Sequence, residues 1–226
     1  MVRKKAKDAN LKYTNITMDC GTAIKGFYVI WNNPERLRNV ILHLEDFHFM
    51  QAFLGVIGKF VQGSGFEDII FQLGLCQPGS MKAILKGKHY NKCWLIHESY
   101  TESIFRLFLE RYVDDKYKED YRSYDTSQDV KDSDMQFIQE LVLKGLNNEF
   151  GITAQYWLQY MSLVDLMHGL HYSLQVNNWE ERLYYLWKML PYFFFFDGVH
   201  YSRYGSYYLQ SIENIDVTYP GAKGEL

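Results

Sequence analysis

At 226 residues, of which 47% are apolar, the chain is long enough to bury one sizeable hydrophobic core. The aromatic share of 17% argues against a disordered adaptor, and the formal net charge of −3 gives no support to a strongly basic DNA-binding surface. Three cysteines without CxxC spacing favour free thiols in a reducing compartment over a disulfide framework. No apolar run is long enough to span a membrane, so we expect a soluble intracellular protein.

The first predicted unit, residues 1–48, is a strand, a helix and a second strand. Residues 13–18 are β-prone, and residues 22–31 carry apolar side chains at helical spacing before Asn32–Pro34 interrupts the pattern. Residues 40–44 form a continuous apolar run that is typical of a buried strand. Because a helix connects the two strands, we expect them to be parallel.

A helical region over residues 49–112 follows. Apolar residues recur at helical spacing in three segments, 49–60, 67–73 and 94–112. Residues 113–134 are acidic and tyrosine-rich and have no apolar period, which predicts an exposed loop.

Residues 135–226 form a second helical region, rich in aromatic side chains. Pro191 should end one of its helices, and the following run Tyr192–Phe196 has no amphipathic period, so we expect that run to lie in the core on both faces. Tyr201–Gly205 should open a further helix. The pattern as a whole predicts an α/β protein in which helix predominates. The helices expected in this region before Pro191 are 135–146, 154–174 and 179–190.

Acidic residues and a histidine follow the two predicted strands. Asp19 comes directly after the first strand, while Glu45, Asp46 and His48 come after the second. Because parallel strands end at the same edge of a sheet, these side chains should lie close together, and carboxylate oxygens suit Mg²⁺ or Mn²⁺. The candidate catalytic residues are therefore Asp19 and His48, and the candidate metal ligands are Asp19 and Asp46. Capping of the helix that begins near Phe49 is an equally good interpretation of Asp46.

Two other groups of polar residues have weaker claims. Lys86, Lys88 and Lys92 form a local basic patch around an aromatic residue, which suits contact with a nucleic acid but equally suits an exposed turn. His168 and His171 share a helix face, yet no acid or cysteine cluster accompanies them. We interpret both histidines as core or surface residues.

Several phrases of the sequence resemble a widespread group of uncharacterised, transposon-derived animal proteins. The similarity in order and spacing extends from about residue 15 to residue 220. The phrases that carry it are Phe47–His48, Phe53–Gly58, Gly63–Gly65, Leu85–Asn91, Met189–Asp197 and His200–Tyr204.

More distantly, Asp19 followed by His48 resembles the second catalytic aspartate and the downstream histidine of RNase H-like DDE transposases. The resemblance implies that Asp19 is a metal ligand, that His48 is a structural or catalytic histidine, and that the helices after it are an all-α insertion. In the related proteins the position of Asp46 is often glycine, which weakens Asp46 as a ligand. The strand with the first aspartate would precede residue 1, and the closing glutamate would follow Leu226.

The resulting hypothesis is a transposase-derived RNase H-like fragment that once carried out metal-dependent DNA cleavage and strand transfer and is inactive alone. It implies a nuclear protein, DNA as the ancestral partner, and a protein partner or oligomer that completes the sheet. Mg²⁺ or Mn²⁺ would be its metal, with none bound by the fragment alone. One alternative is a non-enzymatic helical interaction domain. Another is a compact metallohydrolase using Asp19, Asp46, His48 and a further histidine.

Overall fold

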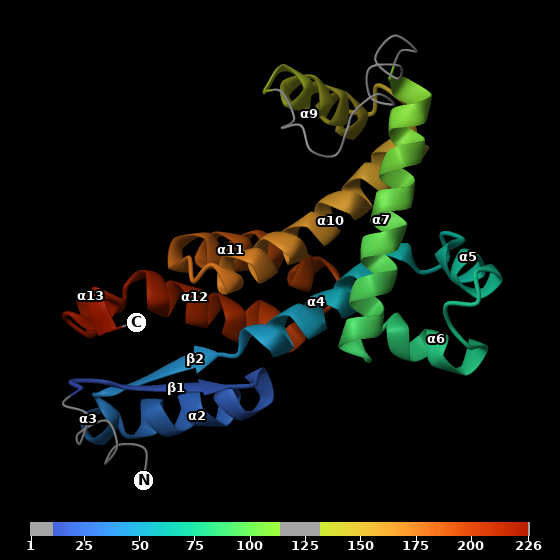
Figure 1. Ribbon diagram of the computed structural model, residues 1–226. Coiled ribbons are helices and arrows are strands. Elements are labelled where there is room, and N and C mark those ends of the chain that lie inside the picture. Colours follow the sequence, from blue (N-terminus) through green and yellow to red (C-terminus); the bar gives the residue numbers. More distant parts are fainter. Residues whose placement is uncertain (1–10, 114–131, 226) are drawn as a thin grey trace.

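The computed structural model describes residues 11–113 and 132–225, in which helices predominate and two strands form a small sheet (Figure 1). The predicted α/β class with predominant helix is confirmed at this level, as is the parallel pairing of the strands. The predicted acidic loop, 113–134, falls almost wholly outside the described residues. No helix in the described part of the chain combines the length and hydrophobicity that a membrane crossing requires.

The strand–helix–strand unit begins the described chain. The two strands pair along their whole length, and a crossover made of one long and one short helix connects them. All residues of the second strand are buried, as its continuous apolar run predicts. The elements are β1 (Thr14–Met18), α2 (Cys20–Asn32), α3 (Pro34–Leu37) and β2 (Val40–Leu44).

The rest of the described chain is helical. The helix that follows β2, α4, leads from the sheet into this part, and α10 packs against α4, α7, α9 and α11 (Figure 1). The elements are α4 (Asp46–Val61), α5 (Phe66–Gln72), α6 (Pro78–Ile84), α7 (Tyr90–Tyr112), α9 (Asp132–Leu146), α10 (Ile152–Gln175), α11 (Trp179–Phe195), the π-helical turn η1 (Tyr201–Gly205), α12 (Ser206–Glu213), α13 (Ile215–Thr218) and the 3-10 turn η2 (Ala222–Glu225).

The sheet lies between α2 on one face and the C-terminal helices on the other (Figure 1). Helix α2 packs so closely that a Cβ atom on Gly26 would come within 2.7 Å of the Leu42 Cδ1 atom. On the opposite face, Tyr208 of α12 meets His43 of β2 with their ring centroids 6.1 Å apart. Both faces of β2 are therefore covered, and one continuous cluster of buried side chains extends from the strands into the helices.

Helix α11 passes through Pro191, so the prediction that this proline ends the helix is wrong. Packing outweighs the missing N–H group, because Phe193 is buried and its ring contacts Phe49 and Phe53 at centroid distances of 5.1 and 5.7 Å. The aromatic run consequently keeps a helical period. Phe194 and Phe195 point away from the core and are 60% and 79% exposed, which corrects the expectation that the run is buried on both faces.

Two helix starts also differ from the prediction. Helix α4 begins at Asp46 rather than near Phe49, because the chain turns into the helix directly after β2. Helix α6 lies outside the three helical segments predicted for this region, and Pro78 occupies its first turn, where the fixed φ of proline is favourable and its missing N–H costs nothing. The three cysteines, predicted to be free, are free and buried.

Candidate functional site

The carboxyl ends of β1 and β2 lie at the same edge of the sheet. Met18, the last residue of β1, stands opposite Leu44, the last residue of β2, and the Glu45 N–H donates to the Met18 carbonyl oxygen at 2.9 Å. Asp19 and Glu45 therefore leave the sheet side by side. We call Asp19, Glu45 and His48 the strand-end cluster.

Asp19 is the N-cap residue of α2. Its Oδ1 accepts a hydrogen bond from the Thr22 N–H at 3.0 Å, and its Oδ2 accepts one from the Thr22 hydroxyl at 2.6 Å. These hydrogen bonds lower the pKa of the Asp19 carboxyl group, and the nearby His48 makes a further small contribution in the same direction. Both carboxylate oxygens thus already have a partner within their own helix.

Glu45 and His48 form a pair across the first turn of α4. The Glu45 Oε2 atom and the His48 Nδ1 atom are 2.8 Å apart, and both side chains are 43% exposed. Since a protonated Nδ1 donates to the carboxylate, the pairing leaves Nε2 as the ring nitrogen free for another contact. The predicted catalytic residues Asp19 and His48 are therefore at one edge, with His48 oriented by Glu45.

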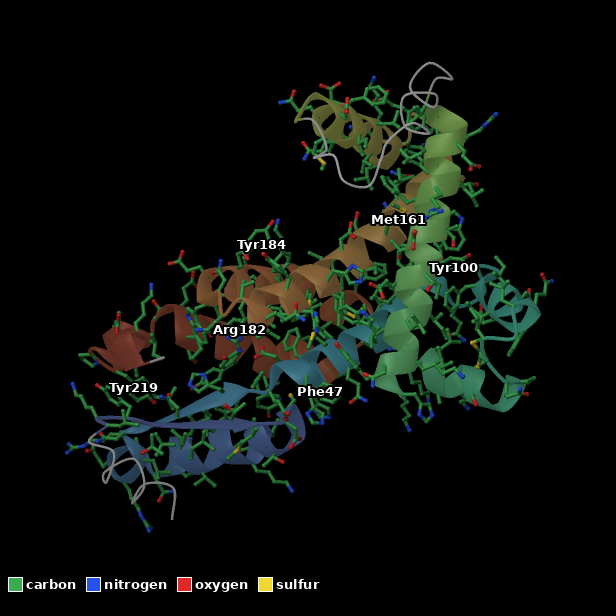
Figure 2. All side chains as sticks on the ribbon, viewed as in Figure 1. Phe47, Tyr100, Met161, Arg182, Tyr184 and Tyr219 are labelled. Carbon is green, nitrogen blue, oxygen red and sulfur yellow. The ribbon has the colours of Figure 1, made fainter. Side chains whose placement is uncertain are left out.

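Asp46, the other predicted metal ligand, is engaged elsewhere. The Arg182 Nε atom donates to its Oδ1 at 2.9 Å and to its Oδ2 at 3.1 Å, and Arg182 Nη2 lies 2.9 Å from Oδ1. Arg182 comes from α11 (Figure 2) and is only 6% exposed. Its guanidinium group lies 4.6 Å from the centre of the Trp179 ring. Glu45, not Asp46, occupies the N-cap position of α4, and its side chain makes no cap hydrogen bond.

The ion pair continues into a buried polar network on the α12 face of the sheet. Arg182 Nη2 donates to the Tyr208 hydroxyl oxygen at 3.0 Å, and that oxygen lies 3.4 Å from His43 Nδ1. His43 Nε2 donates to the Asn15 Oδ1 atom at 3.0 Å, so Nδ1 of the neutral ring accepts from Tyr208. Burial lowers the pKa of His43 to about 4, and the positive charge of Arg182 acts in the same direction.

Sequence reasoning did not single out Arg182, Tyr208 or His43. Asp46 and Arg182 are 136 residues apart in the chain, and no local pattern connects positions at that separation. One signal was present: His43 interrupts an apolar strand, and a polar side chain at such a position requires a buried partner.

The other predicted polar residues are not part of the strand-end cluster. Lys86 and Lys88 lie in the turn between α6 and α7, Lys92 lies in the first turn of α7, and all three are exposed. His168 and His171 both pack on the Trp94 ring, at centroid distances of 4.9 and 4.8 Å. Within the described residues, no three His, Cys, Asp or Glu side chains are placed to hold a metal ion together.

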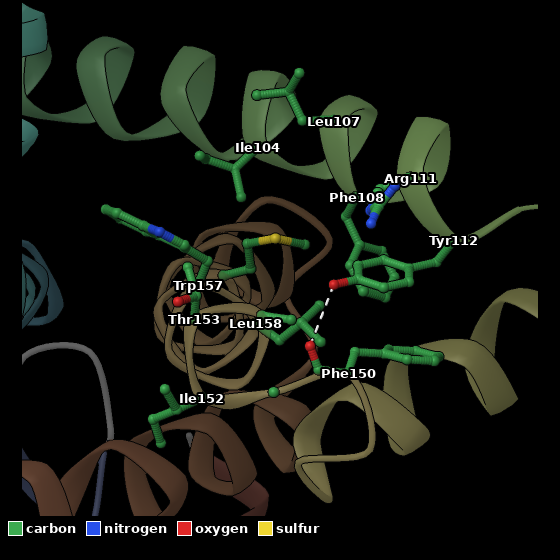
Figure 3. A pocket seen from close by; sticks show the side chains of 13 residues that line it. Ile104, Leu107, Phe108, Arg111, Tyr112, Phe150, Ile152, Thr153, Trp157 and Leu158 are labelled. Atoms are coloured by element: carbon green, nitrogen blue, oxygen red, sulfur yellow. Dashed lines mark hydrogen bonds between the residues drawn. The ribbon is translucent and has the colours of Figure 1, made fainter.

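A separate apolar pocket lies between the C-terminal half of α7 and the start of α10 (Figure 3). Its volume is about 350 Å³, and the Tyr112 hydroxyl closes one side by donating to the Phe150 carbonyl oxygen at 3.3 Å. Side chains that line it include Ile104, Phe108, Arg111, Tyr112, Phe150, Trp157 and Met161.

Comparison with known proteins places the chain in a family. No curated protein and no solved structure matches the chain. The family described as "Domain of unknown function (DUF8702)" matches residues 1–223, and the chain therefore belongs to that family.

Proposed function

We propose that the chain is a transposase-derived RNase H-like unit whose ancestor cleaved DNA with metal ions and which does not cleave DNA by itself. The observation that carries the proposal is the parallel β1–α2–β2 arrangement that brings Asp19, Glu45 and His48 to one edge. This is where a nuclease of that kind would hold its acids, and a large helical part follows directly. The ancestral activity makes the nucleus the expected location and DNA the ancestral partner.

The side chains at this edge do not fit a complete Mg²⁺ or Mn²⁺ site. Phosphoryl transfer of this type needs two or three carboxylates that are free to bind hard cations. Asp19 is occupied with Thr22, and Asp46 is held by the buried Arg182 on the other side of α4. At this edge the described residues supply Asp19, which serves as the N-cap of α2, and the partly exposed pair of Glu45 and His48.

We further propose that a strand from another chain or segment completes the sheet. Within the described residues β1 pairs only with β2, and the side chains of Asn15 and Thr17 on β1 are exposed. An exposed strand edge presents N–H and C=O groups that a further strand can bind. Lys86, Lys88 and Lys92 remain a proposed contact with a nucleic acid, supported only by their exposure next to one another in the chain.

Titration calorimetry with Mn²⁺, on the wild type and on Asp19→Ala, tests the proposed loss of catalysis. We expect no binding in the micromolar range by either protein, and no nicking of supercoiled plasmid in Mg²⁺ or Mn²⁺. Micromolar binding that disappears in Asp19→Ala, together with plasmid nicking, would instead establish a complete metal site and support the metallohydrolase alternative.

A non-enzymatic interaction domain is the second candidate, and the exposed aromatic side chains favour it. Phe195 borders a hollow of about 610 Å³ between α4, α10 and α11, whose lining also includes Phe60, Tyr192 and Phe196. Exposed aromatic rings beside a hollow are typical of protein-binding surfaces. This role is compatible with the first proposal, because a unit that has lost catalysis can retain a binding surface.

A further inference from the structure

Helices α2 and α12 together expose three large aromatic rings. Tyr28 and Trp31 of α2 and Tyr207 of α12 are 46%, 43% and 38% exposed. We call these three residues the α2–α12 aromatic surface. A single exposed ring needs no explanation, but Trp31 contacts both tyrosines, and a contiguous exposed patch of this kind suggests a binding function.

The three rings are held in fixed orientations. The Trp31 Nε1–H group donates to the Tyr207 hydroxyl oxygen at 2.9 Å, and the Trp31 ring meets the Tyr28 and Tyr207 rings edge to face, at centroid distances of 5.4 and 5.1 Å. Phe27 and Tyr204 support them from below: the buried Phe27 ring stacks on Trp31 at 6.0 Å, and the Tyr204 hydroxyl donates to that of Tyr28 at 3.4 Å. The surface is therefore preorganised, which reduces the entropy lost on binding.

Cations accompany these rings although the chain as a whole is acidic. The segment from α2 to β2 carries Lys25, Arg36 and Arg38 against the single acid Glu35, while the net charge of the chain is −3. Lys25 lies one helical turn before Tyr28. Arg203 adds a further exposed cation, with its guanidinium group 5.5 Å from the centre of the Tyr204 ring. The aromatic surface thus has two neighbouring cations, Lys25 on α2 and Arg203 in η1, the turn that directly precedes α12.

We propose that the α2–α12 aromatic surface binds single-stranded nucleic acid, with bases stacked on its rings and phosphates beside its cations. Unpaired bases stack on aromatic rings largely without regard to sequence, and phosphates complement Lys and Arg. A proline-rich peptide fits less well, since it carries no phosphates that would complement Lys25 and Arg203. A duplex fits less well because its bases are already stacked.

This surface is separate from the strand-end cluster. Trp31 lies twelve residues after Asp19 along α2, a distance of about 18 Å at 1.5 Å per residue. The inference therefore does not depend on the proposed loss of DNA cleavage, and either can fail without the other.

Fluorescence anisotropy of a labelled oligo(dT) 12-mer at low salt tests the proposal. The wild type should bind the single strand more tightly than a duplex of equal length, and Trp31→Leu should weaken this binding about tenfold or more, because a stacked base is lost. Trp31→Phe, which keeps a ring, should retain most of the affinity. Arg203→Gln should reduce the slope of log K against log salt by about one, as expected when one phosphate contact is removed.

Trp187→Leu is the matched control, since Trp187 on α11 is 39% exposed and lies outside the aromatic surface. It should bind as the wild type does, and circular dichroism checks that each variant is folded. If Trp31→Leu does not fold, Trp31→Phe and Arg203→Gln, compared with the wild type, decide the question. The proposal is wrong if the wild type does not bind the single strand, if the duplex binds as tightly, or if both tryptophan-to-leucine variants lose affinity equally.

Discussion

Arg182 is a buried cation whose only acidic partner in the described structure is Asp46. The pair joins α11 to the first turn of α4, and Tyr208 and Trp179 complete the surroundings of the guanidinium group. An ion pair of this kind contributes little net stability compared with apolar side chains of equal volume, yet removing one partner leaves a charge buried without compensation. The cost of leaving Arg182 without its partner can therefore be measured by substituting Asp46 alone.

Replacing Asp46 with asparagine should therefore destabilise the protein strongly. We expect Asp46→Asn to lower the free energy of unfolding by about 3 kcal/mol in urea denaturation, because Arg182 stays buried and charged. Asp68→Asn is the control, since Asp68 also lies in the first turn of a helix but is exposed. It should cost no more than about 0.5 kcal/mol. Equal costs for the two variants would show that only the helix dipole is involved.

Among the helices and strands, the sequence predicted best those features that depend on neighbouring residues in the chain. Residues 40–44 are the strand that was expected, since a run of that length that is apolar apart from His43 suits a strand buried on both faces. Pro191 was misjudged, because contacts of Phe193 with distant residues keep α11 helical beyond it. The position of Asp19 and His48 at the edge of the sheet was predicted. The ion pair of Asp46 with Arg182 was not, because Arg182 lies 136 residues away in the chain.

The close approach of α4 to the segment before α7 yields a prediction about glycine. A Cβ atom on Gly58 of α4 would lie 2.1 Å from the Leu85 carbonyl oxygen, whereas one on Gly79 of α6 would meet nothing within 4 Å. We expect Gly58→Ala to lower the free energy of unfolding by about 2 kcal/mol despite the better helix propensity of alanine. Gly79→Ala should raise it by about 0.5–1 kcal/mol. Thermal or urea unfolding of both variants checks this, and a stabilised Gly58→Ala would contradict the packing described.

Across the whole molecule, buried neutral histidines should make stability depend on pH. Burial lowers the pKa of His97 to about 4, and that of His43 is also about 4. The unfolded chain, with an ordinary histidine pKa near 6.5, binds these protons first, so stability is complete above that pH and falls as the pH drops toward 4. The slope should reach about 1.4 kcal/mol per pH unit for each histidine.

Urea unfolding of the wild type and of His97→Gln between pH 7.5 and 4.5 measures this slope. The variant should show a shallower loss of stability with falling pH than the wild type, because one of the two buried neutral histidines has been removed. Parallel pH profiles for the two proteins would mean that His97 is not held neutral in the folded state.

For the molecule as a whole we propose part of an RNase H-like sheet, open along β1 and completed by a partner strand. In the parallel ladder the Thr14 N–H donates to the Asn39 carbonyl oxygen at 2.8 Å. Because backbone N–H groups alternate sides along a strand, the Ile16 N–H should also point toward β2. The N–H groups of Asn15 and Thr17 must then point away from β2, toward the exposed edge.

Amide hydrogen exchange of β1, followed by NMR on the full chain in isolation, tests this claim most directly. We predict slow exchange for Thr14 and Ile16, and exchange faster by orders of magnitude for Asn15 and Thr17. Uniform protection of all four amides would show that the edge is already covered within the chain. In that case the sheet would not be an open remnant, and the molecule would not be a transposase-derived fragment that pairs with a partner strand.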